Sequence, residues 1–180
     1  DTIISGDGGG WITGGAGADN LQGGSGGEGF IIGSPEDYAG DTISGGSGSD
    51  YIYFTSTTPG QTLSLDANLS DSDGTIRVLI ADQATSNPNG TTALNVDASA
   101  VTLAGGIGLW ANDGANQLTG SSQGDDIQGG GGNDTITGGA DDDVINAGAG
   151  TNVVSGAGVG ADTITHDTAG TVTVAVTGIG

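Results

Sequence analysis

Acidic residues recur at a fixed interval in two parts of this 180-residue sequence, each after a run of glycine or other small residues. Between residues 129 and 155 the chain reads GGGGNDTIT, GGADDDVIN and AGAGTNVVS, which are nine-residue units with Asp or Asn at position six. Carboxylates and backbone carbonyls are the oxygen ligands that hard divalent cations such as Ca²⁺ prefer. Glycine favours such turns because it adopts positive φ without a steric cost. The types and spacing of these residues therefore indicate cation binding at repeated turns.

The charge balance points the same way and excludes several classes of protein. The sequence holds 22 acidic residues and a single Lys or Arg, Arg77, which gives a formal net charge of −21. Such a charge strains a compact chain by self-repulsion, so we expect bound cations to offset it. The lack of basic residues argues against a nucleic-acid partner. The absence of cysteine excludes disulfides and cysteine-ligated zinc, and no apolar run reaches the roughly 18–20 residues of a membrane helix.

The nine-residue period extends well beyond residues 129–155 and sets the architecture. It covers residues 1–53, where four extra residues (32–35) intervene, and residues 111–165, where one extra residue precedes the last unit. Each unit has a large apolar residue two places after its turn-ending residue. The turn-ending residue is acidic or Asn in every unit except the one that carries Gly10: Asp1, Asp19, Glu28, Asp41, Asp50, Asn116, Asp125, Asp134, Asp143, Asn152 and Asp162.

These units resemble the calcium-binding nonapeptide GGxGxDxUx of RTX (repeat-in-toxin) proteins, the haemolysin-type β-roll family. The resemblance implies an all-β fold without helices, a parallel β-roll or β-helix solenoid with calcium-binding glycine-rich turns. In that family, positions 1–6 form the turn and positions 7–9 the strand, so two units complete one coil. It also implies several bound Ca²⁺ ions, each shared by the acidic residues of successive coils on one edge.

On this pattern the eleven turn-ending residues named above are the candidate metal ligands. One edge of the second block is expected to carry Asn116, Asp134 and Asn152, and the other Asp125, Asp143 and Asp162. In the first block the two edges are Asp1, Asp19 and Asp41, and Glu28 and Asp50. Asn lowers the ligand charge, so the edge with Asn116 and Asn152 is expected to bind calcium more weakly. Isolated Asp residues in turns are also simply good turn formers, but a run in register favours calcium.

Alternation sends position eight of each unit inward. The predicted core ladder is therefore Ile3, Ile12, Leu21, Phe30, Ile43, Ile52, Leu118, Ile127, Ile136, Ile145, Val154 and Ile164. Trp11, Tyr51 and Tyr53 are expected to face outward, where a packed surface aromatic is a commoner role than sugar binding.

We divide the chain into a first RTX block (1–53), a middle β segment (54–110) and a second RTX block with a terminal strand (111–180). Residues 54–110 lose the nine-residue period, but TLSL, TIRVLIA, TALNV and AVTL read as strands. Wider β-helix coils on the same axis are the favoured interpretation, and an inserted sandwich is the alternative. The run LNVDASAVTLAGGIG resembles the lead-in to calcium repeats and favours the continuous solenoid.

No catalytic constellation is predicted, so the chain is not expected to be an enzyme. His166 is the single histidine, and Asp71, Asp73 and Asp82 are the one candidate set for glycoside chemistry, but DSDG is more simply a turn.

The leading hypothesis is a calcium-binding structural solenoid of a secreted or cell-surface protein, such as an adhesin, surface-layer or fibre subunit. The alternative is the calcium-binding module of a secreted protease, lipase or epimerase.

Two further expectations concern surfaces. A carbohydrate- or ice-binding face would need a regular outward threonine ladder, and Thr13, Thr137 and Thr165 are too scattered. The open strand edges of a roll, including the alternating run Thr171–Thr177, predict head-to-tail self-association.

Overall fold

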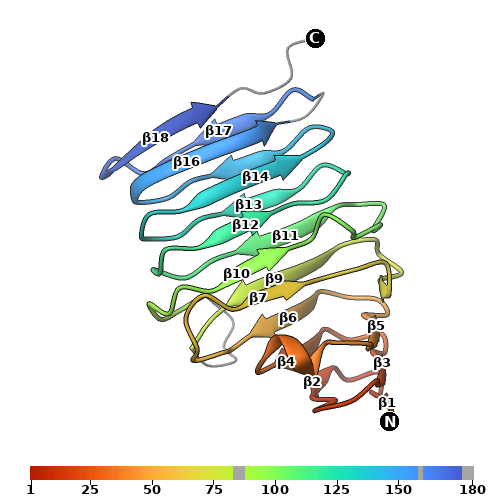
Figure 1. Cartoon of the computed structure of the whole chain (residues 1–180). Helices are drawn as coiled ribbons and strands as arrows, with labels where there is room; N and C mark the ends of the chain where they lie inside the picture. Colours follow the sequence, from red (N-terminus) through yellow and green to blue (C-terminus); the bar gives the residue numbers. More distant parts are fainter. Residues whose placement is uncertain (83–87, 158–159, 176–180) are drawn as a thin grey trace.

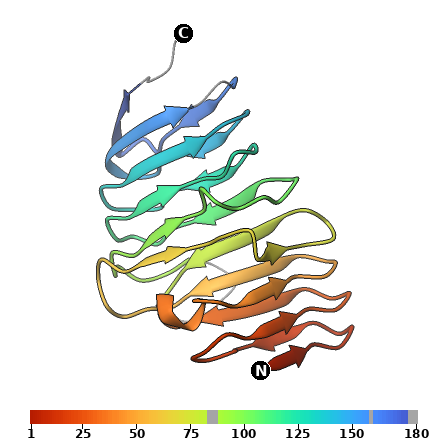
Figure 2. The same cartoon turned by 45° about the vertical axis from the view of Figure 1, so that its right-hand side comes forward.

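The protein is a stack of short parallel strands wound into a solenoid, as the computed structural model shows for residues 1–82, 88–157 and 160–175 (Figures 1 and 2). The predicted all-β parallel roll is confirmed, and the one helical element is a single 3₁₀ turn, η1 (Pro35–Asp37), among the described residues. None of them forms a helix long and apolar enough to cross a membrane.

The strands are β1 (Thr2–Ile4), β2 (Gly10–Ile12), β3 (Asn20–Gln22), β4 (Glu28–Ile32), β5 (Thr42–Ser44), β6 (Asp50–Phe54), β7 (Thr62–Ser64), β8 (Leu69–Ser70), β9 (Ile76–Ile80), β10 (Asn95–Asp97), β11 (Ile107–Trp110), β12 (Gln117–Thr119), β13 (Asp126–Gln128), β14 (Thr135–Gly139), β15 (Val144–Asn146), β16 (Gly150–Ala157), β17 (Thr163–Thr165) and β18 (Gly170–Ala175).

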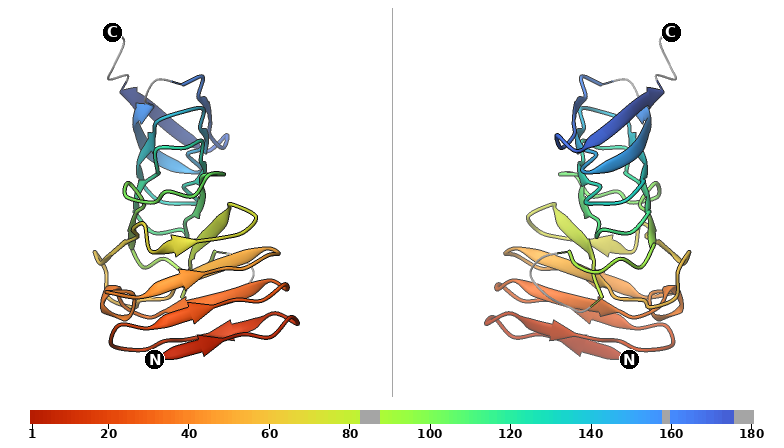
Figure 3. Two further views of the ribbon diagram at one scale, coloured as in Figure 1. Left: turned by 90° about the vertical axis from the view of Figure 1, so that its right-hand side faces the viewer. Right: turned by 90° about the vertical axis from the view of Figure 1, so that its left-hand side faces the viewer.

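Three sheets make up the walls of the solenoid. An eight-stranded sheet runs the length of the molecule in the order β17-β15-β13-β11-β9-β6-β4-β2. Opposite it lie two smaller sheets. The four-stranded sheet β1-β3-β5-β8 joins strands of the first block to β8 of the middle segment, and the six-stranded sheet β18-β16-β14-β12-β10-β7 joins strands of the second block to β10 and β7 of the middle segment. The two ends of the solenoid are turned relative to each other. In Figure 3 the strands of the first block are seen broadside, and those of the second block are seen nearly on edge.

The aliphatic ladder at position eight sets the register and fills the core. Ile127 pairs with Ile145, which pairs with Ile164, and the other block repeats this with Ile3, Leu21 and Ile43. The predicted ladder residues are buried or, for Ile3 and Ile164, partly buried. Each fully buried aliphatic side chain stabilises the fold by about 1.5–3 kcal/mol, which is why such short strands hold together only as a stack.

The middle segment continues the stack through wider coils. β9 pairs with β6 on one side and with β11 on the other, while β10 pairs with β7 and β12. β8 ends the four-stranded sheet by pairing with β5. The coil that contains β7, β8 and β9 thus passes from one opposing sheet to the other, which is the pairing expected of a continuous solenoid rather than of an inserted sandwich.

The four extra residues of the first block lead into the 3₁₀ turn. Asp37 stabilises the start of this turn, because its Oδ2 accepts hydrogen bonds from the backbone N–H of Ser34 (3.0 Å) and of Gly33 (3.1 Å). Tyr38 then packs into the core at 4% exposure, and its hydroxyl donates to Asp66 Oδ1 at 3.1 Å. The insertion is accommodated without breaking the register of β3 with β5.

The outward aromatic residues form one packed group on the eight-stranded sheet. Trp11 is 57% exposed, whereas Tyr53 is only 4% exposed. Neighbouring rings cover Tyr53: its ring centroid lies 4.9 Å from that of Trp11, which reaches it over Gly29, and 6.0 Å from that of Tyr51. A Cβ on Gly29 would meet the Trp11 ring at 2.6 Å, so glycine is needed for this contact.

Candidate metal centres

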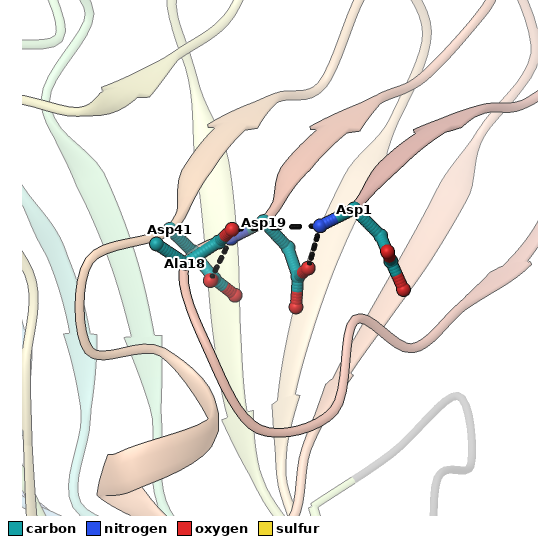
Figure 4. Close-up of polar contacts among 4 residues, drawn as sticks. All are labelled: Asp1, Ala18, Asp19 and Asp41. Atoms are coloured by element: carbon teal, nitrogen blue, oxygen red, sulfur yellow. Dashed lines mark hydrogen bonds and ion pairs between the residues drawn. The ribbon is translucent and has the colours of Figure 1, made fainter.

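The turn-ending carboxylates form hydrogen-bonded ladders along the edges of the solenoid. In the first block, Asp41 Oδ1 accepts a bond of 2.8 Å from the backbone N–H of Asp19, one coil away (Figure 4). Asp19 Oδ1 in turn accepts one of 2.5 Å from the amino group of Asp1. The other edge repeats this pattern, since Asp50 Oδ1 accepts from the N–H of Glu28 at 2.7 Å.

The second block builds the same ladder on both of its edges. Asp143 Oδ1 accepts from the N–H of Asp125 (2.9 Å), and Asp162 Oδ1 from that of Asp143 (3.0 Å). Across the roll, Asp134 Oδ1 accepts from Asn116 (2.9 Å) and Asn152 Oδ1 from Asp134 (2.8 Å). One oxygen of each side chain is thereby used to join two coils, and the side-chain direction is fixed.

The second oxygen of most of these carboxylates is buried and has no hydrogen-bond partner. Buried charged oxygens without a partner are costly, by several kcal/mol for an ionised group. Six of these atoms are carboxylate oxygens at position six, and their recurrence there indicates a common role in binding a cation: Asp19 Oδ2, Glu28 Oε2, Asp41 Oδ2, Asp50 Oδ2, Asp134 Oδ2 and Asp143 Oδ2. Two further buried oxygens without a partner are Asp71 Oδ2 and the amide oxygen Asn116 Oδ1.

Glycine at position one leaves a space beside most of these unpartnered oxygens, namely those of Asp19, Glu28, Asp50, Asp134 and Asp143. A Cβ on Gly129 would lie 2.8 Å from Asp134 Oδ2 and 2.6 Å from the carbonyl oxygen of Ala147, which is position one of the next coil. A Cβ on Gly23 would lie 2.7 Å from Glu28 Oε2 and still closer to the carbonyl oxygen of Gly45, which is position one of the next coil. Ca²⁺ binds carboxylate and carbonyl oxygens at about 2.3–2.6 Å. The space, the oxygen donors and the uncompensated charge therefore fit a calcium ion between successive turns.

Burial shifts the titration of the same carboxylates. It raises the pKa of Asp134 to about 7, against the effect of the hydrogen bond from Asn116. Burial also raises the pKa of Asp143 to about 6, with a further contribution from the charges of Asp125 and Asp162. The pKa of Asp50 rises to about 7 through burial and then the charges of Asp71 and Glu28. Without a cation, ionisation of these groups is thus less favourable in the folded protein than in the unfolded chain.

Asparagine partly replaces the cation by satisfying carbonyl groups itself. Asn152 Nδ2 donates to the carbonyl oxygen of Ala147 at 2.7 Å, and Asn116 Nδ2 to that of Leu94 at 2.6 Å. These carbonyls therefore need no positive ion to compensate them, which weakens the case for strong calcium sites at Asn116 and Asn152. On the other edge, Asp125 Oδ2 accepts from the N–H of Ser121 (2.5 Å), so its second oxygen is already partnered.

The outermost candidates are placed differently from the rest. The side chain of Asp1 is 87% exposed, and this residue contributes its amino group rather than its carboxylate to the ladder. Asp162 is only half-buried. Within the described residues, no three His, Cys, Asp or Glu side chains gather into one metal-binding cluster. Each candidate centre thus depends on one or two carboxylates together with backbone carbonyls.

The residues considered for catalysis do not form a constellation. His166 is exposed and its ring Nδ1 lies 2.8 Å from the carbonyl oxygen of its neighbour Asp167. Asp71 Oδ1 accepts from the N–H of Asp73, as in an ordinary Asx turn. Asp82 takes no part in that turn; its backbone N–H donates to Asn89.

Sequence reasoning missed the place of Asp71 among the buried carboxylates. Ser70 pairs with Ser44, so Asp71 stacks on Gly45 as position one of the next coil. Counting back from the buried Val78 reveals a degenerate unit, DSDGTIRVL, in which the turn-ending residue is Ile76. The period could have located this unit, but its apolar turn end concealed it.

Comparison with known proteins agrees with the repeat pattern. The family of the RTX calcium-binding nonapeptide repeat matches four copies, at residues 38–55 and 119–154. Searches of curated proteins and of solved structures each found no match. The matched segments include Asp41, Asp50, Asp125, Asp134, Asp143 and Asn152.

Proposed function

From the RTX calcium-binding nonapeptide repeats that this chain carries, we propose that it is a calcium-stiffened structural solenoid of a secreted or cell-surface protein. The observation that carries the proposal is the row of buried, unpartnered carboxylate oxygens beside glycine-lined spaces. Ions held there join successive coils, so calcium is part of the fold rather than a substrate. Such repeats are typical of secreted proteins, where free calcium is plentiful.

The proposed role is non-enzymatic and extends along the whole solenoid. An adhesin, surface-layer or extracellular fibre subunit needs a rod that is stiff only after export, and calcium-dependent folding provides this. The second candidate is the calcium-binding module of a secreted protease, lipase or epimerase. An HExxH or GxSxG motif elsewhere in a longer protein would favour the module.

Loss of Asp143 is expected to weaken calcium binding more than loss of Asn116. Asp143 Oδ2 is an orphaned carboxylate oxygen and its Oδ1 joins two coils, whereas Asn116 is neutral and its amide already donates to Leu94. We expect the Asp143→Ala variant to need about tenfold more calcium at its folding midpoint, which corresponds to about 1.4 kcal/mol. Asn116→Ala is expected to shift the midpoint severalfold less.

Isothermal titration of chelator-treated protein with Ca²⁺ measures both effects. Asp113→Asn is the matched control, because Asp113 is exposed and its removal changes the net charge without touching a ladder. Mg²⁺ serves as the cation control, since it demands tighter octahedral geometry and keeps its water. Equal calcium midpoints for Asp143→Ala and Asn116→Ala would contradict the assignment of the two edges.

We also propose that the solenoid self-associates end to end. In the described part of the chain, β1, β2, β17 and β18 are paired on one side only, and Ile4 and Val174 on these strands are 69% and 45% exposed. Unpaired strand edges are templates for further pairing. Light scattering across a concentration series in calcium tests this, and strictly monomeric particles at high concentration would rule it out.

A further inference from the structure

Two carboxylates, those of Asp50 and Asp71, approach each other at the end of the first block, and the repeat pattern does not predict this pair. Glu28 and Asp50 lie on successive coils of one edge, and the next coil has Ile76 in the corresponding place. Ile76 is fully buried and offers no oxygen. The edge therefore lacks its next turn-ending ligand above Asp50.

Asp71 supplies an oxygen at this point from a different position of the coil. In the preceding gap, a Cβ on Gly23 would meet Glu28 Oε2 at 2.7 Å and, still closer, the carbonyl oxygen of Gly45. In the gap above, a Cβ on Gly45 would lie 2.7 Å from Asp50 Oδ2 and 2.7 Å from Asp71 Oδ2. The side chain of Asp71 thus takes the place that a position-one carbonyl holds one coil earlier.

Asp50 Oδ2 and Asp71 Oδ2 are both buried, and neither has a hydrogen-bond partner. Asp50 is 1% exposed, and its Oδ1 is committed to the N–H of Glu28. Asp71 Oδ1 is committed to the N–H of Asp73 at 2.7 Å, which fixes the direction of its Oδ2. Two negative oxygens that converge on one small space repel each other unless a cation lies between them.

We propose that Asp50 and Asp71 hold a divalent calcium-type cation that closes the first repeat block. This site rests on the proposed calcium role. Asp50 belongs to the matched repeat segment 38–55, but Asp71 lies outside both matched segments. The ligands of this site are two carboxylates rather than a carboxylate and a carbonyl. A site of higher charge at the junction joins the repeat block to the wide coil formed by β7, β8 and β9.

The test is the number of calcium ions bound per chain, counted by native mass spectrometry and by equilibrium dialysis with calcium. Asp71→Asn retains Oδ1, which accepts a hydrogen bond from the backbone N–H of Asp73, but replaces the proposed ligand Oδ2 by an amide NH₂ group. Asp97→Asn is the matched control, because Asp97 Oδ1 accepts from the N–H of Ser99 (3.0 Å) in the same kind of turn. We expect Asp71→Asn to bind one ion fewer than the wild type and Asp97→Asn to bind the same number.

A second variant covers the case in which Asp71→Asn fails to fold. Gly45→Ala keeps both carboxylates and places a methyl group where the ion is proposed to lie, so it is also expected to lose one ion. An unchanged count in either folded variant overturns this site and leaves the repeat sites intact. A wild-type protein that binds no calcium overturns the proposed function, and this site with it.

Discussion

Removal of calcium is expected to abolish most of the parallel β-structure. A net charge of −21 and the rows of unpartnered carboxylate oxygens leave the metal-free solenoid without compensation for its buried charge. An ion present at a thousandfold excess over its Kd stabilises the folded state by about 4 kcal/mol. Because whole domains are stable by only about 5–15 kcal/mol, the loss of several ions is enough to unfold this one.

Circular dichroism with excess chelator at low ionic strength measures this loss directly. The β signal is expected to collapse on chelation and to return when calcium, but not an equal concentration of sodium, is restored. High salt is a necessary control, since it screens the surface repulsion and will recover part of the structure without calcium. A β signal that persists unchanged in chelator at low salt would show that binding energy is not folding energy here.

Acid is expected to replace calcium in part. Burial raises the pKa of Asp134 and of Asp50 to about 7 and that of Asp143 to about 6, from the ordinary value of 3.8. A raised folded-state pKa means that the folded protein binds protons more tightly than the unfolded chain. Its stabilising effect is therefore fully present below about pH 4 and is lost as the pH rises through about 6–7.

Metal-free protein is thus expected to be more folded near pH 5 than at pH 8, whereas calcium-loaded protein shows the reverse trend because protons compete with the metal. Thermal melts in chelator across this range measure the first trend. The Asp134→Asn variant removes one of the titrating groups, so its metal-free stability should depend less on pH. Metal-free protein that becomes more stable between pH 5 and 8 would contradict the burial of these carboxylates.

The repeat pattern predicted the coil, the core and the stacking of the turn-ending side chains because all three follow from one period. A side chain at position eight stacks on its equivalent one coil later, as Ile127 does on Ile145, and position six does the same for Asp125 and Asp143. The wide coils were less predictable, because β8 has only two residues and its pairing with β5 is set by distant chain segments.

Other features depend on contacts that no period encodes. Tyr53 of β6 is buried by Trp11 of β2, and the two rings meet over Gly29 of the intervening strand β4. The second oxygen of Asp125 is partnered by the N–H of Ser121, where other units have a glycine-rich turn without such a bond. Asp71, whose Oδ2 is buried, was concealed by Ile76, which breaks the acidic pattern at the position that defines a repeat.

The central claim is that calcium ions lie between successive turns, beside the second oxygens of the repeat carboxylates. Anomalous X-ray diffraction from crystals grown in calcium, collected at a long wavelength where calcium scatters anomalously, tests this most directly. Peaks are expected beside Asp134 Oδ2 and Asp143 Oδ2, each also within coordination distance of a carbonyl oxygen from the next coil. Peaks confined to the exposed surface, or none at these turns in calcium-saturated protein, would contradict the account.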